Sequence, residues 1–191
     1  MNEEPWELPY TPWNNRTAFY TYLRGGFRKA IWARHPVKLA YIQAKRFKAP
    51  MGKVAGKDVW CCECELCGRT FPQGQCEIDH LQEAGSLRSP DDIRDFVVRL
   101  SFVDFNDIRI LDKTCHKIVS YAQRESITFN EANIEKAVIA ACKDKRLRDK
   151  LLKAGYSEGD VSNGPKRRGC AREMVVSGKW PRVVPITVEG E

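Results

Sequence analysis

Apolar residues recur with two different periods along this chain, and each period predicts a different element. Apolar side chains at every fourth position over 19–31 predict an amphipathic helix that runs toward Arg34 and stops before Pro36. A second helix is expected over 37–47. The same spacing predicts further helices over residues 89–100, 113–124, 130–142 and 143–153.

Alternation of apolar and polar residues over 76–80 and 107–111 predicts two strands, and 59–61 is interpreted as a third, shorter one. Residues 1–15 show neither period and are expected to form an irregular arm. Residues 49–53 suggest a basic linker, 164–169 a basic loop, and the tail from Val175 an extended segment. Helices and strands in this mixture predict the α+β class.

The charge of this chain is unevenly distributed, although the net value is only +7. Residues 8–57 contain eleven Lys and Arg and no Asp or Glu, whereas 58–126 contain thirteen acids and eight bases. An acidic centre that can hold a divalent metal, flanked by cationic arms, suits a protein that grips phosphates on either side of a reaction site. The alternative is that the basic run is only a solvated face.

Neither secretion nor membrane insertion is expected from this sequence. No run of eighteen apolar residues occurs, and the acidic amino terminus lacks an apolar signal region, so a cytoplasmic location is predicted. Eight cysteines are present, four of them within 61–67. Because thiols stay reduced inside cells, this crowding favours metal binding over a disulfide framework.

Thiols, carboxylates and two of the three histidines gather within about fifty residues. Cys64 and Cys67 have the two-residue spacer that turns both sulfurs toward one metal, although Cys62 could replace Cys64 at a longer spacing. Cys61 and Cys76 are interpreted as packing thiols. An Asp-His pair and a Cys-His pair follow, so a structural and a catalytic metal could lie side by side. His35 is given no role.

These motifs resemble the HNH nucleases, the ββα-metal family, in the phage form with zinc knuckles. The family pattern is C-x-x-C, a strand ending in D-H, and then N-L-x-x-L-C-x-x-C-H opening a helix. This chain matches it with Cys64/Cys67, Asp79-His80 and residues 107–116. It departs at Asp107, where the family has Asn and Asn106 stands one residue early, and at Asp112, where the family has Cys.

The resemblance implies a small ββα-metal (His-Me finger) core, braced by a zinc site and carrying helical N- and C-terminal extensions. The corresponding domains are a basic helical arm over 1–57, the nuclease core with its zinc knuckle over 58–126, and a helical, basic extension over 127–191. The helix over 89–100 would be inserted between the two halves of the motif and would brace the core.

The implied activity is metal-dependent hydrolysis of DNA phosphodiesters, as an endonuclease that nicks or cuts both strands. His80 would be the general base, with Asp107 or Asn106 holding its loop. Asp79 and His116 would hold one catalytic Mg²⁺ or Mn²⁺ ion, whose identity ligand type alone does not fix. The ligands implied for a structural Zn²⁺ are Cys64, Cys67, Asp112 and Cys115.

DNA is the partner that the resemblance implies, and phage packaging proteins are a second option that the sequence leaves open. The candidate DNA-binding side chains come from both basic arms: Arg24, Arg28, Lys45, Arg46, Lys166, Arg167 and Arg168. Two alternatives remain. One is a non-catalytic, zinc-braced DNA-binding or scaffold protein of the HNH fold, and the other is a redox protein that uses the cysteines of 61–67.

Overall fold

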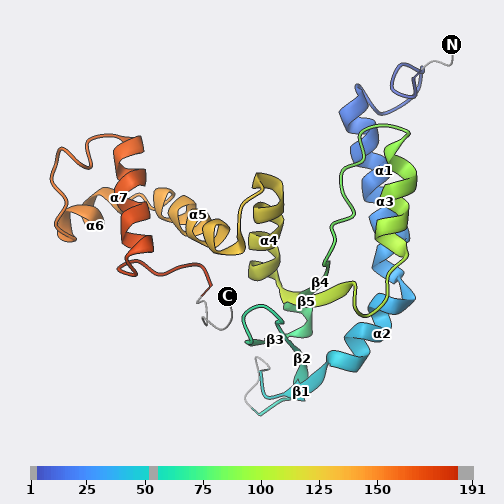
Figure 1. The fold of residues 1–191 in the computed structure, drawn as a ribbon, viewed down its shortest axis with the longest axis horizontal. Helices are drawn as coiled ribbons and strands as arrows, with labels where there is room; N and C mark the ends of the chain where they lie inside the picture. Colours follow the sequence, from blue (N-terminus) through green and yellow to red (C-terminus); the bar gives the residue numbers. More distant parts are fainter. Residues whose placement is uncertain (1–3, 52–55, 185–191) are drawn as a thin grey trace. The chain divides into compact units, whose positions relative to one another are not determined.

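The computed structural model describes residues 4–51 and 56–184 and divides into two compact units (Figure 1). The first unit comprises residues 1–65 and 70–110, and the second comprises 66–69 and 111–191. Helices and strands occur together, so the predicted α+β class is confirmed.

Three α-helices build most of the first unit: α1 (Arg16–Ala30), α2 (Pro36–Lys45) and α3 (Asp92–Ser101). Asn15 caps α1 through its side chain, which accepts a hydrogen bond from the Ala18 amide. The apolar stripe of α1 packs on α3, where Phe27 contacts Phe96 and Tyr20 is buried. The two helices lie side by side in Figure 1.

The predicted first helix is shorter than expected. It ends at Ala30, and a 3₁₀ helix, η1 (Trp32–Arg34), leads into α2. The second predicted helix also ends early, because Phe47 belongs to strand β1 (Phe47–Ala49). Ala49 of the predicted linker lies in this strand, and residues 52 and 53 fall outside the described part of the chain.

A small antiparallel sheet has the order β1-β2-β3. The predicted strand at 59–61 is β2 (Val59–Glu63), which pairs Cys61 with Phe47 on one side. On its other side it pairs Cys62 with Phe71 of β3 (Thr70–Pro72). The sequence did not predict β1 or β3, because three-residue strands carry too little alternation to be recognised.

The two predicted alternating strands pair with each other as β4 (Cys76–His80) and β5 (Ile108–Asp112). A short 3₁₀ helix, η2 (Gln73–Gln75), precedes β4. The Leu81 amide donates to the Asp107 carbonyl at 2.8 Å, so the end of β4 lies beside the start of β5. Ile78 of β4 and Ile108 and Ile110 of β5 are buried in one cluster with Tyr41.

The second unit is helical, with α4 (Lys113–Glu125), α5 (Phe129–Cys142), α6 (Leu147–Lys153) and α7 (Gly164–Val176). Ala141, Leu147, Leu151 and Ala171 bury their side chains in one cluster that joins α5, α6 and α7. Burial of these aliphatic groups is the main favourable term that holds the helices together.

The basic loop predicted over 164–169 is wrong, because these residues form the first turns of α7. Asn163 caps that helix by accepting from the Lys166 amide, and Pro165 occupies its first turn, where it needs no amide donor. Val175 and Val176 end the helix instead of beginning an extended tail, and 185–191 lie outside the described residues. The helix predicted over 143–153 begins only at Leu147.

Across the described ranges, no helix has both the length and the apolar character needed to cross a membrane.

Candidate functional site

Four side chains bring their ligand atoms together between the end of β2 and the start of α4. They are Cys64, Cys67, Asp112 and Cys115, and their sulfur and carboxylate atoms all lie within 4.8 Å of one another. Cys64, Asp112 and Cys115 are buried, and Cys67 is half-buried. These are the four residues predicted as zinc ligands, so the sequence prediction of this cluster agrees with the structure.

One distance within the cluster, between a sulfur and a carboxylate oxygen, is compatible with a tetrahedral ion. Ligands about 2.0–2.3 Å from a tetrahedral zinc lie roughly 3.3–3.8 Å from one another. The Cys67 Sγ to Asp112 Oδ2 distance is 3.7 Å, which falls in that range. Three thiols and one carboxylate also match the donor chemistry of a closed metal site. The cluster could therefore hold one metal ion.

Local structure orients these ligands. Gly68 follows Cys67 with a φ of +64°, in the left-handed region that a turn of this kind needs and that glycine adopts without strain. Asp112 caps α4, because its Oδ1 accepts from the amides of Thr114 at 2.8 Å and Cys115 at 3.3 Å. One carboxylate oxygen therefore begins the helix while the other faces the thiols.

Positive charge offsets the anionic ligand set. Arg69 lies beside the cluster and forms a hydrogen bond to Cys67, which is the main cause that raises the pKa of Arg69. The charges of Asp112 and Cys115 raise this pKa further. The amino-terminal end of α4 adds the positive end of a helix dipole beside the cluster. Both features place positive charge beside a ligand set whose metal-binding form is anionic.

The remaining cysteines near the cluster take no part in it. Cys62 is buried, and burial raises the pKa of its thiol, with Cys76 as its hydrogen-bonding neighbour. Cys61 is fully buried and its thiol faces the Val59 carbonyl at 3.5 Å. Of the two spacings left open by the sequence, the structure therefore selects Cys64 with Cys67.

His80 stands at the end of β4 with its imidazole held on two sides. Its ring lies on the Trp32 indole, with 4.0 Å between centroids. Its Nε2 is 3.3 Å from the Leu100 carbonyl oxygen, which can only accept, so Nε2 carries the proton and Nδ1 is the basic atom. Burial is the main cause that lowers the pKa of His80 below its ordinary value, which keeps the ring neutral at neutral pH.

Asp79, one residue before His80, is buried and ionically paired. Arg109 of β5 donates to Asp79 Oδ2 from Nε at 3.1 Å and from a terminal nitrogen at 3.0 Å. Both contacts reach the same carboxylate oxygen. Asp79 acts on its neighbour His80, because its charge raises the pKa of His80, although burial has the larger effect and lowers it.

The other predicted catalytic residues lie at the two ends of β5. His116 is half-buried in the first turn of α4, as expected. Asp107 and Asn106 are exposed in the turn before β5. The Asp107 carboxylate accepts from the Asp104 amide at 2.8 Å, whereas its main-chain carbonyl binds Leu81, the residue after His80. The contact with the His80 loop is therefore made by the backbone of Asp107.

Two of the predicted DNA-binding residues of the first unit, Arg24 and Arg28, lie on α1. Burial is the main cause that lowers the pKa of Arg28, and the positive charge of Arg24 lowers it further. Arg46 lies over the Trp60 ring at 4.2 Å, and Trp60 is itself exposed. Lys45 is 3.9 Å from Glu65.

The three predicted DNA-binding residues of the second unit all bond within that unit. Lys166 donates to the Gly159 carbonyl at 2.8 Å and Arg167 to the Val161 carbonyl at 2.9 Å. Arg168 pairs with Glu135 at 2.6 Å. These contacts tie α7 to its surroundings, and each would compete with a phosphate.

Sequence reasoning missed the groups that surround His80. Trp32 and the Leu100 carbonyl reach it from η1 and α3, and no local pattern marks either one. Arg109 was likewise not assigned to Asp79, although their opposite charges on two expected neighbouring strands were a usable signal.

Comparison with protein-family models, with curated proteins and with solved structures finds no match to this chain. The fold and the cluster define it as an α+β protein with a four-residue Cys/Asp site that could hold a metal ion.

Proposed function

We propose that this protein is a metal-dependent DNA endonuclease of the HNH type. In this proposal β4, β5 and α4 form the ββα-metal core, with Asp79 and His80 on the first strand and His116 on the helix. The observation that carries the proposal is the setting of His80: a neutral, oriented imidazole with a basic Nδ1, next to a charged carboxylate.

His80 would act as the general base. Its Nδ1 takes a proton from a water molecule while that water oxygen forms a bond to phosphorus. The bond from phosphorus to the leaving sugar oxygen breaks, and that oxygen takes a proton from solvent. Trp32 and the Leu100 carbonyl fix the ring, so little orientational freedom is lost when substrate binds.

Asp79 and His116 would hold the catalytic ion, and one carboxylate with one imidazole is a donor set that Mg²⁺ or Mn²⁺ accepts. When bound, that ion would neutralise charge developing on the phosphate and the leaving oxygen. The cluster of Cys64, Cys67, Asp112 and Cys115 would hold Zn²⁺ apart from the chemistry, where it stabilises a two-stranded pair that is marginal alone.

One observation favours the non-catalytic alternative, a zinc-braced DNA-binding or scaffold protein. Arg109 occupies Asp79 Oδ2 with two nitrogens, and a guanidinium so placed competes with a divalent ion for the carboxylate. A catalytic ion would have to share Asp79 with Arg109 or displace it.

Supercoiled plasmid incubated with the protein and Mg²⁺ or Mn²⁺ tests the proposal. We expect nicked or linear product from the wild type and a loss of at least about 100-fold in rate for His80→Gln, because the general base is removed.

The matched control is His35→Gln. His35 also lies against Trp32 and also contacts a carbonyl at the end of α3, Ser101 at 3.0 Å, so both substitutions disturb similar packing. Activity retained in His35→Gln and lost in His80→Gln supports a base at position 80. DNA binding without cleavage in either metal would refute the nuclease and support the alternative.

A further inference from the structure

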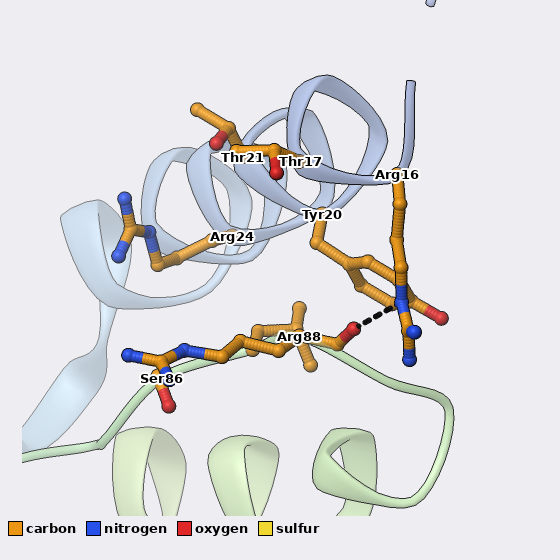
Figure 2. Close-up of a pocket in the computed structure, with 8 residues that line it drawn as sticks. Arg16, Thr17, Tyr20, Thr21, Arg24, Ser86 and Arg88 are labelled. Carbon is orange, nitrogen blue, oxygen red and sulfur yellow. Dashed lines mark hydrogen bonds between the residues drawn. The ribbon is translucent and has the colours of Figure 1, made fainter. Parts of the chain in front are cut away.

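A cavity of about 490 Å³ in the first unit is lined by α1 and by the segment that precedes α3. Three arginines, Arg16, Arg24 and Arg88, contribute to its wall, and Figure 2 shows them with the hydroxyl side chains of the cavity. The lining contains no carboxylate. Its volume lies within the range of roughly 300–1,000 Å³ that is typical of ligand sites.

Carboxylates lie near this cavity, because the charges of Glu4, Asp92 and Asp91 help to raise the pKa of Tyr20 after the larger effect of burial. Among the described residues, however, none of the three arginines has a salt bridge to a carboxylate. Asp92 has a structural role, since its carboxylate accepts from the amides of Arg88 and Ser89 at 2.8 and 2.9 Å. Asp92 therefore holds the backbone of the lining segment.

The walls are fixed before any ligand binds. Arg16 Nε donates to the Arg88 carbonyl at 2.9 Å, drawn as the dashed line in Figure 2, which ties α1 to the segment. Arg88 is thus held at both its amide and its carbonyl, while its exposed side chain extends toward that of Arg24. Tyr20 and Leu87 are buried beneath. A preorganised site loses less entropy on binding.

The remaining polar groups are hydrogen-bond donors suited to phosphate oxygens. Thr17, Thr21 and Ser86 contribute hydroxyls to the lining, and so does Tyr20. Burial raises the pKa of Tyr20, so this hydroxyl stays protonated and can donate. Arginine forks with hydroxyl donors and no carboxylate are a chemistry that selects phosphate esters.

The length of the cavity favours a chain of phosphates over a single one. Arg16 and Arg24 are eight residues apart on one helix, which places their backbones about 12 Å apart along the axis. Consecutive phosphates of one DNA strand advance about 3.4 Å along the duplex axis but lie roughly twice that far apart through space, so this span covers about two phosphate steps, or three consecutive phosphates.

We propose that this cavity binds consecutive backbone phosphates of a DNA strand through Arg16, Arg24 and Arg88. Naming DNA as the strand rests on the proposed function. The same α1 leads through η1 to Trp32, on which His80 lies, so the cavity and the proposed base belong to one continuous framework.

Binding of a fluorescent 20-base-pair duplex, followed by anisotropy between 50 and 200 mM salt without added Mg²⁺ or Mn²⁺ and without a chelator, tests this site. The His80→Gln protein is used throughout, so no cleavage occurs. Replacing Arg16, Arg24 and Arg88 by Gln should weaken binding at least about tenfold at 100 mM salt. The salt slope, which is the steepness with which the logarithm of the binding constant falls with the logarithm of salt concentration, should decrease by roughly three, about one per lost phosphate contact.

The matched control replaces Arg124, Arg146 and Arg148 by Gln, three exposed arginines of the second unit, which gives the same change in net charge. We expect its affinity within about twofold of the parent. The single variants Arg24→Gln and Arg88→Gln break no hydrogen bond seen here, and each should lower the salt slope by about one. They test the proposal even if the triple variant unfolds.

Equal binding by the cavity and control variants would overturn the proposal. Arginine-dependent binding of a nucleoside triphosphate without any such dependence for the duplex would also overturn it, in favour of a free nucleotide. Arginine-dependent duplex binding by a wild type that cuts no plasmid would sustain this site and refute the nuclease. Cleavage of plasmid by the wild type, with unaltered duplex binding by the arginine variants, would support the nuclease and refute the proposed phosphate-binding cavity.

Discussion

Asp112 gives its two carboxylate oxygens to two tasks. Oδ1 caps α4 through two amides, and Oδ2 faces Cys67 within the four-residue cluster. Asparagine caps helices about as well as aspartate but is a poorer metal ligand because it carries no charge. The two tasks of Asp112 can therefore be separated by a single substitution.

We predict that the purified protein holds about one zinc per chain and that Cys115→Ser loses it. Loss of a structural metal should remove about 3 kcal/mol or more of stability, which corresponds to roughly 6–12 °C in Tm for a chain of this size. Elemental analysis and thermal denaturation measure both effects. Asp112→Asn should weaken zinc retention against a chelator with a smaller loss of Tm, because the cap remains.

Cys142→Ser is the matched control, since Cys142 is an exposed thiol at the end of α5. It should keep both the metal and the Tm. A metal-free wild type that forms reversible disulfides would contradict the prediction and favour the redox alternative.

At the residue scale, the cysteine ligands were predictable and the partners of His80 were not. Cys64 and Cys67 share one turn, and Asp112 and Cys115 share the first turn of one helix, so their spacing is local and visible in the sequence. Trp32 reaches His80 from a distant segment, and its arrival depends on packing.

At the scale of elements, helix caps decide several boundaries. The basic residues around Gly164 suggest a solvated loop, yet Asn163 caps a helix there, and the buried residues Cys170, Ala171 and Met174 anchor it. The start of α3 differs, because it has no such cap. Asp91 makes no side-chain cap, and Asp92 instead binds the amides of the two residues before Pro90.

The start of α5 offers a test of such caps, because Thr128 and Glu131 form a reciprocal capping box. Thr128→Ala should lower the free energy of unfolding by about 1 kcal/mol, measured by urea denaturation, since it removes the acceptor for the Glu131 amide. Ser120→Ala, an exposed change within α4, is the control and should have little effect.

The same box has a predictable pH dependence. Bonds from the Thr128 amide and hydroxyl lower the pKa of Glu131 below its ordinary 4.5. A carboxyl with a lowered pKa stabilises the fold above its unfolded value and loses that contribution as pH falls through the folded value. The stability difference between wild type and Thr128→Ala should therefore shrink below about pH 4.5. A difference that stays constant down to pH 3 would count against the box.

At the scale of the whole molecule, single polar contacts join segments that are far apart in the sequence. Asn133 of α5 is fully buried, and its side chain donates to the Val184 carbonyl at 2.8 Å and accepts from the Val184 amide at 3.1 Å. The amide and the carbonyl of Val184 thus both bond to the Asn133 side chain. These two hydrogen bonds hold the segment after α7 against α5.

We predict that Asn133→Ala lowers the free energy of unfolding by roughly 2–4 kcal/mol, because it leaves two buried backbone groups without a partner. Asn130→Ala is the matched control, since Asn130 makes an exposed contact with Arg182 of the same segment, and it should cost less than about 1 kcal/mol. Equal losses in the two variants, measured by chemical denaturation, would show that the buried contact has no special weight.

The nuclease assignment and the three-part division of the chain stay predictions, whereas the α+β class and the four-residue cluster that could hold a metal ion are features of the structure. The difference reflects what each depends on. The positions of β4 and β5 and the order of the helices follow from periodicity, which is a local property of the chain, whereas the pairing of the two strands joins separate segments.

The sequence by itself determined most of the helices, the two alternating strands and the two local ligand pairs, because each depends on spacing within one turn or one element. The resemblance to the HNH pattern implied that the two pairs form one site. Only the tertiary structure decided which ring nitrogen of His80 is basic, that Arg109 pairs with Asp79, and that arginines from α1 and the segment before α3 share a cavity. These arrangements join residues from separate segments, and packing of the whole unit brings them together.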